Sequence, residues 1–120
     1  MSVPARQSAR SVDGFIAEIW NIMQAMPEYR GSTTFLITAD HGRGHDLEGW
    51  KDHGDDVEGS SEIWIAALGP DTPARGERIQ CDPVTQSQIA ATIAELLGYD
   101  HGKAFSSAAA PLSDVVVPRR

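Results

Sequence analysis

The chain has 120 residues, 41% hydrophobic and 7% aromatic, a length that suits one modest domain or part of a larger one. Ten lysines and arginines against 17 aspartates and glutamates give a formal net charge of -7, which argues against binding to nucleic acid or an anionic membrane, because both need clustered cations. The single cysteine, Cys81, excludes an internal disulfide framework and a cysteine-based zinc site, and no apolar run is long enough to span a bilayer.

The N-terminal third predicts one helix followed by one strand. Residues 1–10 show no pattern, and we expect them to form a disordered leader. From Val12 to Met26 the apolar residues recur at the spacing of one helical stripe, and Pro27 marks the end of the helix. Residues 33–39 (TTFLITA) are rich in β-branched residues and apolar on both faces, which is typical of a strand in the middle of a helix-covered sheet.

The second half predicts another strand and another helix. Residues 63–68 (IWIAAL) are expected to form the strand. Thr85 and Gln88 have the spacing of a capping box, and the apolar stripe behind them runs to Gly98, which is expected to end the helix. The tail, residues 106–120, is rich in Ala, Ser and Pro and is expected to be partly disordered. Helix, buried strand, long loop, strand and helix together indicate an α/β fold, a layered sheet with flanking helices.

Most of the negative charge lies in the long segment between the two predicted strands. From Asp40 to Glu58 there are seven acidic and two basic residues, a balance of -5 out of the total of -7. Three of the four histidines, His41, His45 and His53, lie in the same segment. A loop of about 20 residues is rare in a compact domain unless it is functional or disordered. We therefore expect this loop to bind a cation.

An Asp-His-Gly triplet occurs twice in this loop, at residues 40–42 and again at 52–54. A carboxylate and an imidazole together suit Zn or Mn, and Gly42 is expected to let the chain turn away and leave the site open. Two metals about 3.5–4 Å apart form the clamp that enzymes use on phosphoryl groups. The alternatives are that Asp40 caps a turn beside an exposed His41, or that the loop is a solvated acidic segment.

The neighbours of these triplets are expected to support the site rather than to form it. His45 is expected to lie beside the ligands without binding the metal. The planar guanidinium of Arg43 matches phosphate or sulfate, so Arg43 is a candidate substrate contact, with a solvated arginine as the alternative. Thr38 is expected only to fill space in the sheet.

Residues 33–42 (TTFLITADHG) resemble the metal-binding strand of the alkaline phosphatase superfamily, which includes sulfatases, nucleotide pyrophosphatase/phosphodiesterases, phosphopentomutase and cofactor-independent phosphoglycerate mutase. Residues 52–54 are similar to the family's later metal histidine. The strand at 63–70 and the helix at 84–98 are similar to the elements that follow it. The resemblance thus covers about residues 11–100, with residues 101–120 as a tail.

This resemblance implies a metal-dependent hydrolase of phosphate or sulfate esters that works through a covalent intermediate. Asp40 and His41 would bind the metal that also activates the nucleophile, and His53 would bind the second. The implied cofactors are two divalent ions, with Zn first and Mn or Ca as alternatives. Phosphate or sulfate, monoester or diester, and hydrolase or mutase all stay open.

The family's nucleophilic Thr or Ser and its remaining ligands precede this region and have no counterpart in the chain. We therefore expect the C-terminal part of a longer enzyme, with the missing N-terminal portion of that enzyme as its partner. Alone, such a part should bind metal weakly and turn over little substrate. The alternatives are a non-catalytic domain whose acidic loop binds one structural cation such as Ca, and an inactive fragment.

Overall fold

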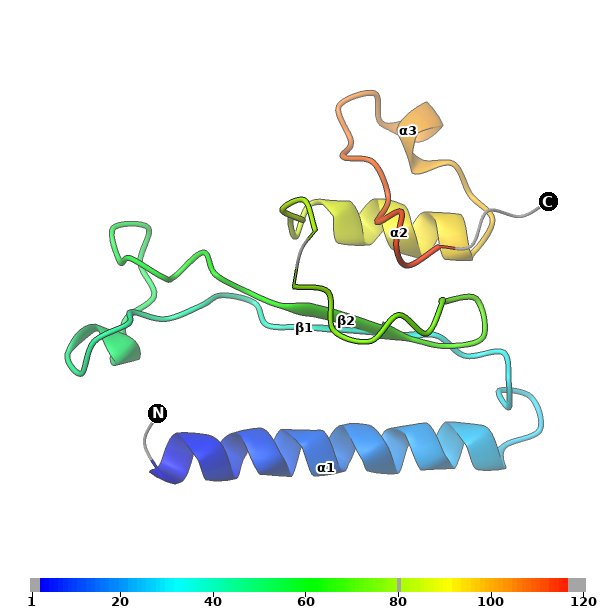
Figure 1. Ribbon diagram of the computed structural model, residues 1–120. Helices are drawn as coiled ribbons and strands as arrows, with labels where there is room; N and C mark the ends of the chain where they lie inside the picture. The colour runs from blue at the N-terminus through cyan, green and yellow to red at the C-terminus, as the bar shows by residue number, and fades with distance from the viewer. Residues whose placement is uncertain (1–2, 80, 117–120) are drawn as a thin grey trace. The chain divides into compact units, whose positions relative to one another are not determined.

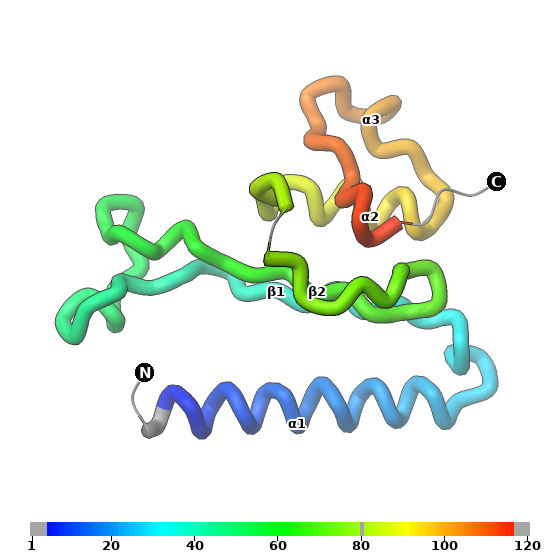
Figure 2. The backbone as a smooth tube through the Cα atoms, viewed as in Figure 1, coloured from blue at the N-terminus to red at the C-terminus, as the bar shows by residue number. Residues whose placement is uncertain are grey.

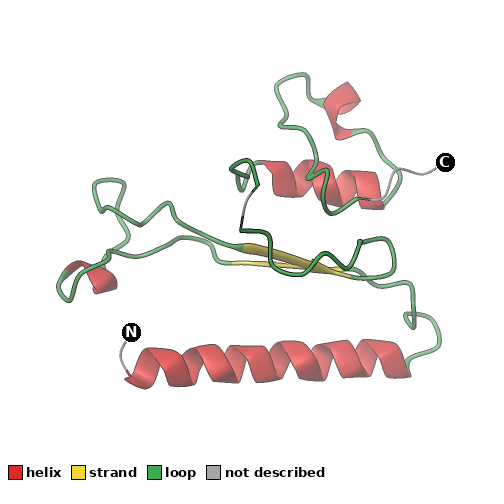
Figure 3. Cartoon of the chain, in the orientation of Figure 1, coloured by secondary structure: helices red, strands yellow, loops and turns green. Residues whose placement is uncertain are grey.

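The computed structural model describes residues 3–79 and 81–116, and the chain divides between Thr33 and Thr34 into two compact units. The first unit contains one long helix. The second contains a pair of strands, a long loop between them and the remaining helices (Figures 1 and 3). None of the helices in the described ranges is both long enough and apolar enough to cross a membrane.

Helix α1 spans Val3–Ala25. It therefore includes residues 3–10, where the sequence predicts a disordered leader, while residues 1 and 2 lie outside the described part of the chain. Residues 5–10 are mostly Ala, Arg and Gln, which favour helix even without an apolar stripe, and a proline is tolerated in the first turn. At the other end, Arg30 donates from Nε to the carbonyl of Gln24 at 2.9 Å, which satisfies one of the free carbonyls of the last turn.

Strands β1 (Phe35–Thr38) and β2 (Ile65–Leu68) form a two-stranded antiparallel sheet. Phe35 lies opposite Leu68, and Thr38 lies opposite Ile65. Both strands are shorter than the predicted segments at 33–39 and 63–68, and their residues are half-buried except for Thr38. A sheet of two strands is too small to test the predicted layered α/β architecture, which therefore stays a prediction.

Helix α2 (Gln88–Leu96) ends at the glycine that the sequence predicts, but its N-cap is Ser87, two residues after the expected Thr85, and makes no side-chain capping hydrogen bond. At its start, the side-chain oxygen of Gln88 accepts from the backbone N–H of Thr85 at 2.9 Å, one half of the expected capping box. At its end, Gly98 has a φ of 85°, and the N–H groups of Gly98 and Tyr99 donate to Glu95 and Ala94 at 2.9 and 2.8 Å. This is the pattern of a Schellman motif, which favours glycine at this position.

The C-terminal segment after the short helix α3 (His101–Ala104) is bound to α2 rather than disordered as far as Val116. Thr92 is fully buried, and its hydroxyl donates to Gln88 at 2.8 Å and accepts from the N–H of Leu112 at 2.9 Å. The side chain of Leu112 is almost fully buried as well. The expected disorder of residues 106–120 is therefore not seen for 106–116, and residues 117–120 lie outside the described part.

Candidate metal centre

The long loop leaves the sheet and returns to it at the same end. Because β1 and β2 are antiparallel, the end of β1 lies beside the start of β2, and the backbone between them runs outward and back (Figure 2). The two limbs are joined by hydrogen bonds from Gly42 N to Ser60 O at 2.6 Å and from Gly44 N to Asp52 O at 3.4 Å. The outgoing and returning limbs of the loop are therefore held together by backbone hydrogen bonds.

Thr38 joins the two limbs at the point where the loop leaves the sheet. Its hydroxyl donates across the strand pair to the carbonyl of Trp64 at 2.7 Å. From the sequence, Thr38 is expected only to fill space in the sheet, and the structure adds this hydrogen bond. The bond could not be predicted, because its partners are 26 residues apart and leave no local signal in the sequence. The bond joins the last residue of β1 to the residue just before β2, at the point where Asp40 and His41 follow.

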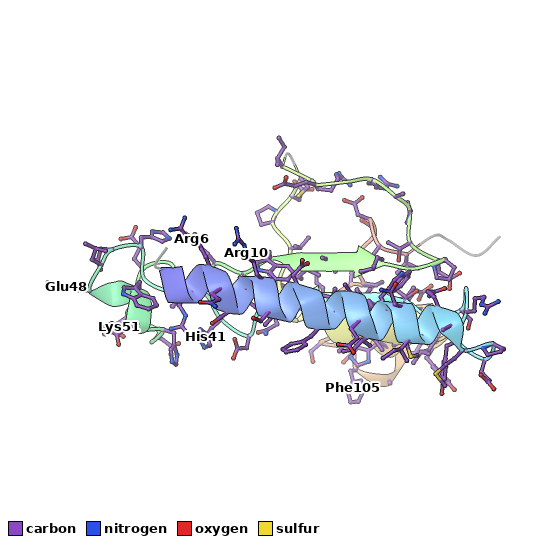
Figure 4. The ribbon with its side chains drawn as sticks, turned by 90° about the horizontal axis from the view of Figure 1, so that it is seen from below. Arg6, Arg10, His41, Glu48, Lys51 and Phe105 are labelled. Atoms are coloured by element: carbon purple, nitrogen blue, oxygen red, sulfur yellow. The ribbon has the colours of Figure 1, made fainter. Side chains whose placement is uncertain are left out.

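The short helix η1 (Gly49–Lys51) forms the tip of the loop. Asp46 stabilises the turn into it by accepting from the N–H of Glu48 at 3.0 Å. Figure 4 labels Glu48 and Lys51 at this tip, and His41 on the side of the loop nearer the sheet. His41 is therefore separate from the tip, whereas His53 follows η1 after its C-cap Asp52.

The structure brings one predicted metal ligand of the second triplet, His53, against His41 of the first, while Asp40 contacts His41 as its neighbour in sequence. His41 Nε2 lies 3.6 Å from Asp40 Oδ2, and Asp40 Oδ1 accepts from the backbone N–H of His41 at 3.0 Å. The ring of His53 stacks on the ring of His41, with the centroids 4.0 Å apart and an angle of 19° between the planes. The second triplet thus folds back onto the first, as the repeated motif predicts.

The hydrogen bonds of His41 suit a metal ligand. Its Nδ1 lies 2.8 Å from the carbonyl oxygen of Gly42, which can only accept, so Nδ1 is the donor, and in the neutral ring the lone pair is on Nε2. A backbone carbonyl that fixes the tautomer in this way is a common partner of metal-binding histidines. Two ligands of one tetrahedral zinc ion, at bond lengths of about 2.0–2.1 Å, lie about 3.4 Å apart. The 3.6 Å between His41 Nε2 and Asp40 Oδ2 matches this separation.

The site is open and incomplete. The side chain of Asp40 is 88% exposed and that of His41 is 29% exposed. In the parts of the chain that the structure describes, no three His, Cys, Asp or Glu side chains are grouped so that they could hold a metal ion. A metal bound by these residues would therefore need further ligands, from water or from another polypeptide segment.

Gln86 and Glu62 contact this region and were not among the predicted site residues. The side-chain amide of Gln86, just before α2, donates to the backbone carbonyl of Asp40 at 3.4 Å. Glu62, on the returning limb, lies 3.2 Å from His45 through Oε2 and Nε2. These contacts span 46 and 17 residues, so neither has a sequence signal of its own.

Arg43 is an exposed residue that spans the loop. One guanidinium nitrogen donates to the carbonyl of Lys51 at 3.3 Å. A guanidinium has five N–H donors, so this bond leaves donors that an anion can use. The position of Arg43, two residues after His41, is compatible with the predicted substrate contact.

A hollow in the second unit lies elsewhere. It has a volume of about 1440 Å³ and is lined by β2, by residues 72–78 and by residues 110–115. None of the three predicted ligands lines it. The candidate metal centre is thus a surface site on the loop.

No protein-family model, no curated protein and no solved structure matches this chain. The functional interpretation therefore depends on the residues themselves.

Proposed function

We propose that this chain is the metal-binding C-terminal part of a hydrolase of phosphate or sulfate esters that resembles the alkaline phosphatase superfamily. The observation that carries the proposal is the stacking of His53 on His41, which joins the two triplets next to the carboxylate of Asp40.

In this proposal, Asp40 and His41 hold one divalent ion and His53 holds the second. The stacked rings place the two histidines side by side, as neighbouring ions in a two-metal site require of their ligands. When bound, such ions activate a nucleophile and stabilise negative charge on the ester oxygens. Zn is the first choice of metal because the donor set mixes imidazole with carboxylate.

The remaining residues of the loop orient the substrate in this proposal. The unused N–H donors of Arg43 would bind the oxygens of an anionic phosphate or sulfate ester. The nucleophile and the missing ligands would come from the N-terminal portion of the enzyme. The exposure of Asp40 is consistent with a site that another segment completes.

Zinc titration of the whole chain, followed by calorimetry, tests the proposal. His41→Ala and His53→Ala should each weaken zinc affinity by about tenfold or more, since even indirect partners of a metal ligand have effects of about 10–100-fold. His101→Ala is the matched control, because His101 at the start of α3 packs on Phe105, the residue after α3, with the ring centroids 4.9 Å apart. Equal affinities in all three variants and the unchanged chain would refute the proposal. Tighter binding of Ca than of Zn would instead favour a structural cation site.

Hydrolysis assays test the expectation that the nucleophile lies outside the chain. With added Zn or Mn, the purified chain should hydrolyse an aryl phosphate or an aryl sulfate no faster than the metal alone. Rapid turnover that depends on His41 would show that the chain carries its own nucleophile.

A further inference from the structure

A second histidine–carboxylate pair joins the two limbs of the loop farther from the sheet than Thr38. His45 lies on the outgoing limb and Glu62 on the returning limb, and Nε2 of the histidine is 3.2 Å from Oε2 of the glutamate. The two residues are 17 positions apart, and His53 lies in the stretch between them. Their contact thus joins the two ends of the segment that carries His53, one of the two predicted metal-binding histidines.

The limbs pack backbone against backbone at this point. Gly59 is buried, and a β-carbon placed on it would lie 2.6 Å from Nε2 of His45 and 2.6 Å from the carbonyl oxygen of Arg43. The imidazole of His45 therefore lies directly over Gly59. The turn from Gly59 to Glu62, closed by a hydrogen bond from Glu62 N to Gly59 O at 3.1 Å, presents both residues to the histidine.

The same closure supports His41. Gly42, the next residue, donates to Ser60 at 2.6 Å, and a β-carbon on Gly42 would lie 2.5 Å from the carbonyl oxygen of Glu62. The segment just after His41 and the segment around Glu62 are therefore in direct contact. A change in the position of the returning limb would move both ends of the stretch that carries His53.

We infer that His45 and Glu62 are positioning residues, whose contact holds His53 against His41 and so sets the spacing of the two metal-binding histidines. This inference rests on the proposed metal site. Both side chains are more than half exposed, and an exposed pair adds little to global stability. The pair should therefore matter for the geometry of the site and not for the folding of the unit.

The test compares His45→Ala, Glu62→Ala, the double variant and Glu62→Gln in the whole chain. Glu58→Ala is the matched control, since it removes the same charge from an exposed position of the same loop. Zinc affinity should fall about tenfold in either alanine variant, at the lower end of the range for indirect partners of a metal ligand. It should fall no further in the double variant, because the two residues act as one unit. Glu62→Gln, which can still accept from His45, should retain most of the affinity, and Glu58→Ala should match the unchanged chain.

A second measurement, on the metal-free chain, separates this inference from the metal site itself. Nuclear Overhauser contacts between the ring protons of His41 and His53 should be present in the unchanged chain and in Glu62→Gln. They should be lost in both alanine variants, while the amide signals of Thr92 and Leu112 stay in place as a check on folding. If these ring contacts persist in the alanine variants, the positioning role is wrong. If the contacts are lost as expected but zinc does not bind the unchanged chain, the proposed function is wrong and the positioning role stands.

Discussion

The α-carbon of Gly42 lies so close to the carbonyl oxygen of Gly59 that no β-carbon fits between them. Gly42 is therefore required for a close approach between the limbs of the loop, and it is not among the glycines with a positive φ, so lack of space and not a left-handed conformation is what requires glycine here. The glycine of the second triplet is different. A β-carbon on Gly54 would meet only a carboxylate oxygen of Asp56, which can move aside.

Alanine at these two glycines should therefore have unequal effects. Gly42→Ala forces two backbone segments apart and should lower the free energy of unfolding by about 1–3 kcal/mol, with a loss of zinc affinity. Gly54→Ala should change the free energy of unfolding by less than about 1 kcal/mol. Chemical denaturation and zinc titration of both variants check this difference. Equal effects would mean that the limbs do not pack as the structure shows.

The sequence predicts the elements whose signals are local. The stripe from Val12 to Met26 predicts most of α1, and Gly98 predicts the end of α2, because helical spacing and a left-handed glycine are properties of neighbouring residues. The order of residues 106–116 could not be predicted in this way. It depends on the hydroxyl of Thr92 and the N–H of Leu112, which lie 20 positions apart.

The same distinction between local signals and long-range contacts applies to the candidate site. The repeated triplet predicts that His53 returns to His41, because one motif repeated within a long loop suggests one site. The sequence does not show that Gln86 reaches the carbonyl of Asp40, or that Glu62 binds His45, since the fold alone brings these residues together. The motif predicts which residues are ligands, but it does not predict the contacts that hold those residues in place.

Two further glycines separate the effect of space from that of backbone conformation. A β-carbon on either Gly14 or Gly31 would meet nothing within 4 Å, but Gly31 has a φ of 67° and Gly14 lies inside α1. Gly14→Ala should raise the free energy of unfolding by about 0.5–1 kcal/mol, because glycine is a poor residue in a helix interior. Gly31→Ala should lower it by about 1 kcal/mol, because a left-handed alanine is strained. Thermal unfolding monitored by circular dichroism measures both, and changes of the same sign would contradict the prediction.

Asp114 should make stability depend on pH in the acidic range. It binds Arg78 and lies 3.4 Å from Arg75. The hydrogen bond from Arg78, followed by the charges of the two arginines, lowers the pKa of Asp114 below its ordinary value of 3.8. A lowered pKa in the folded state means that the stabilisation is present above the ordinary value and is lost as the pH falls through the folded one.

Asp114→Asn should therefore lower the melting temperature at neutral pH, and the difference from the unchanged chain should shrink as the pH falls below the ordinary pKa of 3.8. Asp71→Asn, which removes the same charge from an exposed position, should show no comparable pH dependence. Melting curves across this range decide the matter. A difference for Asp114→Asn that stays constant down to the lowest pH would mean that its carboxylate charge is not what stabilises the C-terminal segment.

The hydroxyl of Thr92 should matter more than its methyl group. Thr92→Val keeps the shape of the side chain but leaves the buried N–H of Leu112 without its acceptor, which should lower the free energy of unfolding by about 1–3 kcal/mol. Thr92→Ser keeps the hydrogen bond and loses one buried methyl group, at a cost of about 1 kcal/mol. Urea denaturation should rank valine below serine, and the amide of Leu112 should exchange faster only in the valine variant. The opposite ranking would show that apolar packing, and not this hydrogen bond, holds the C-terminal segment on α2.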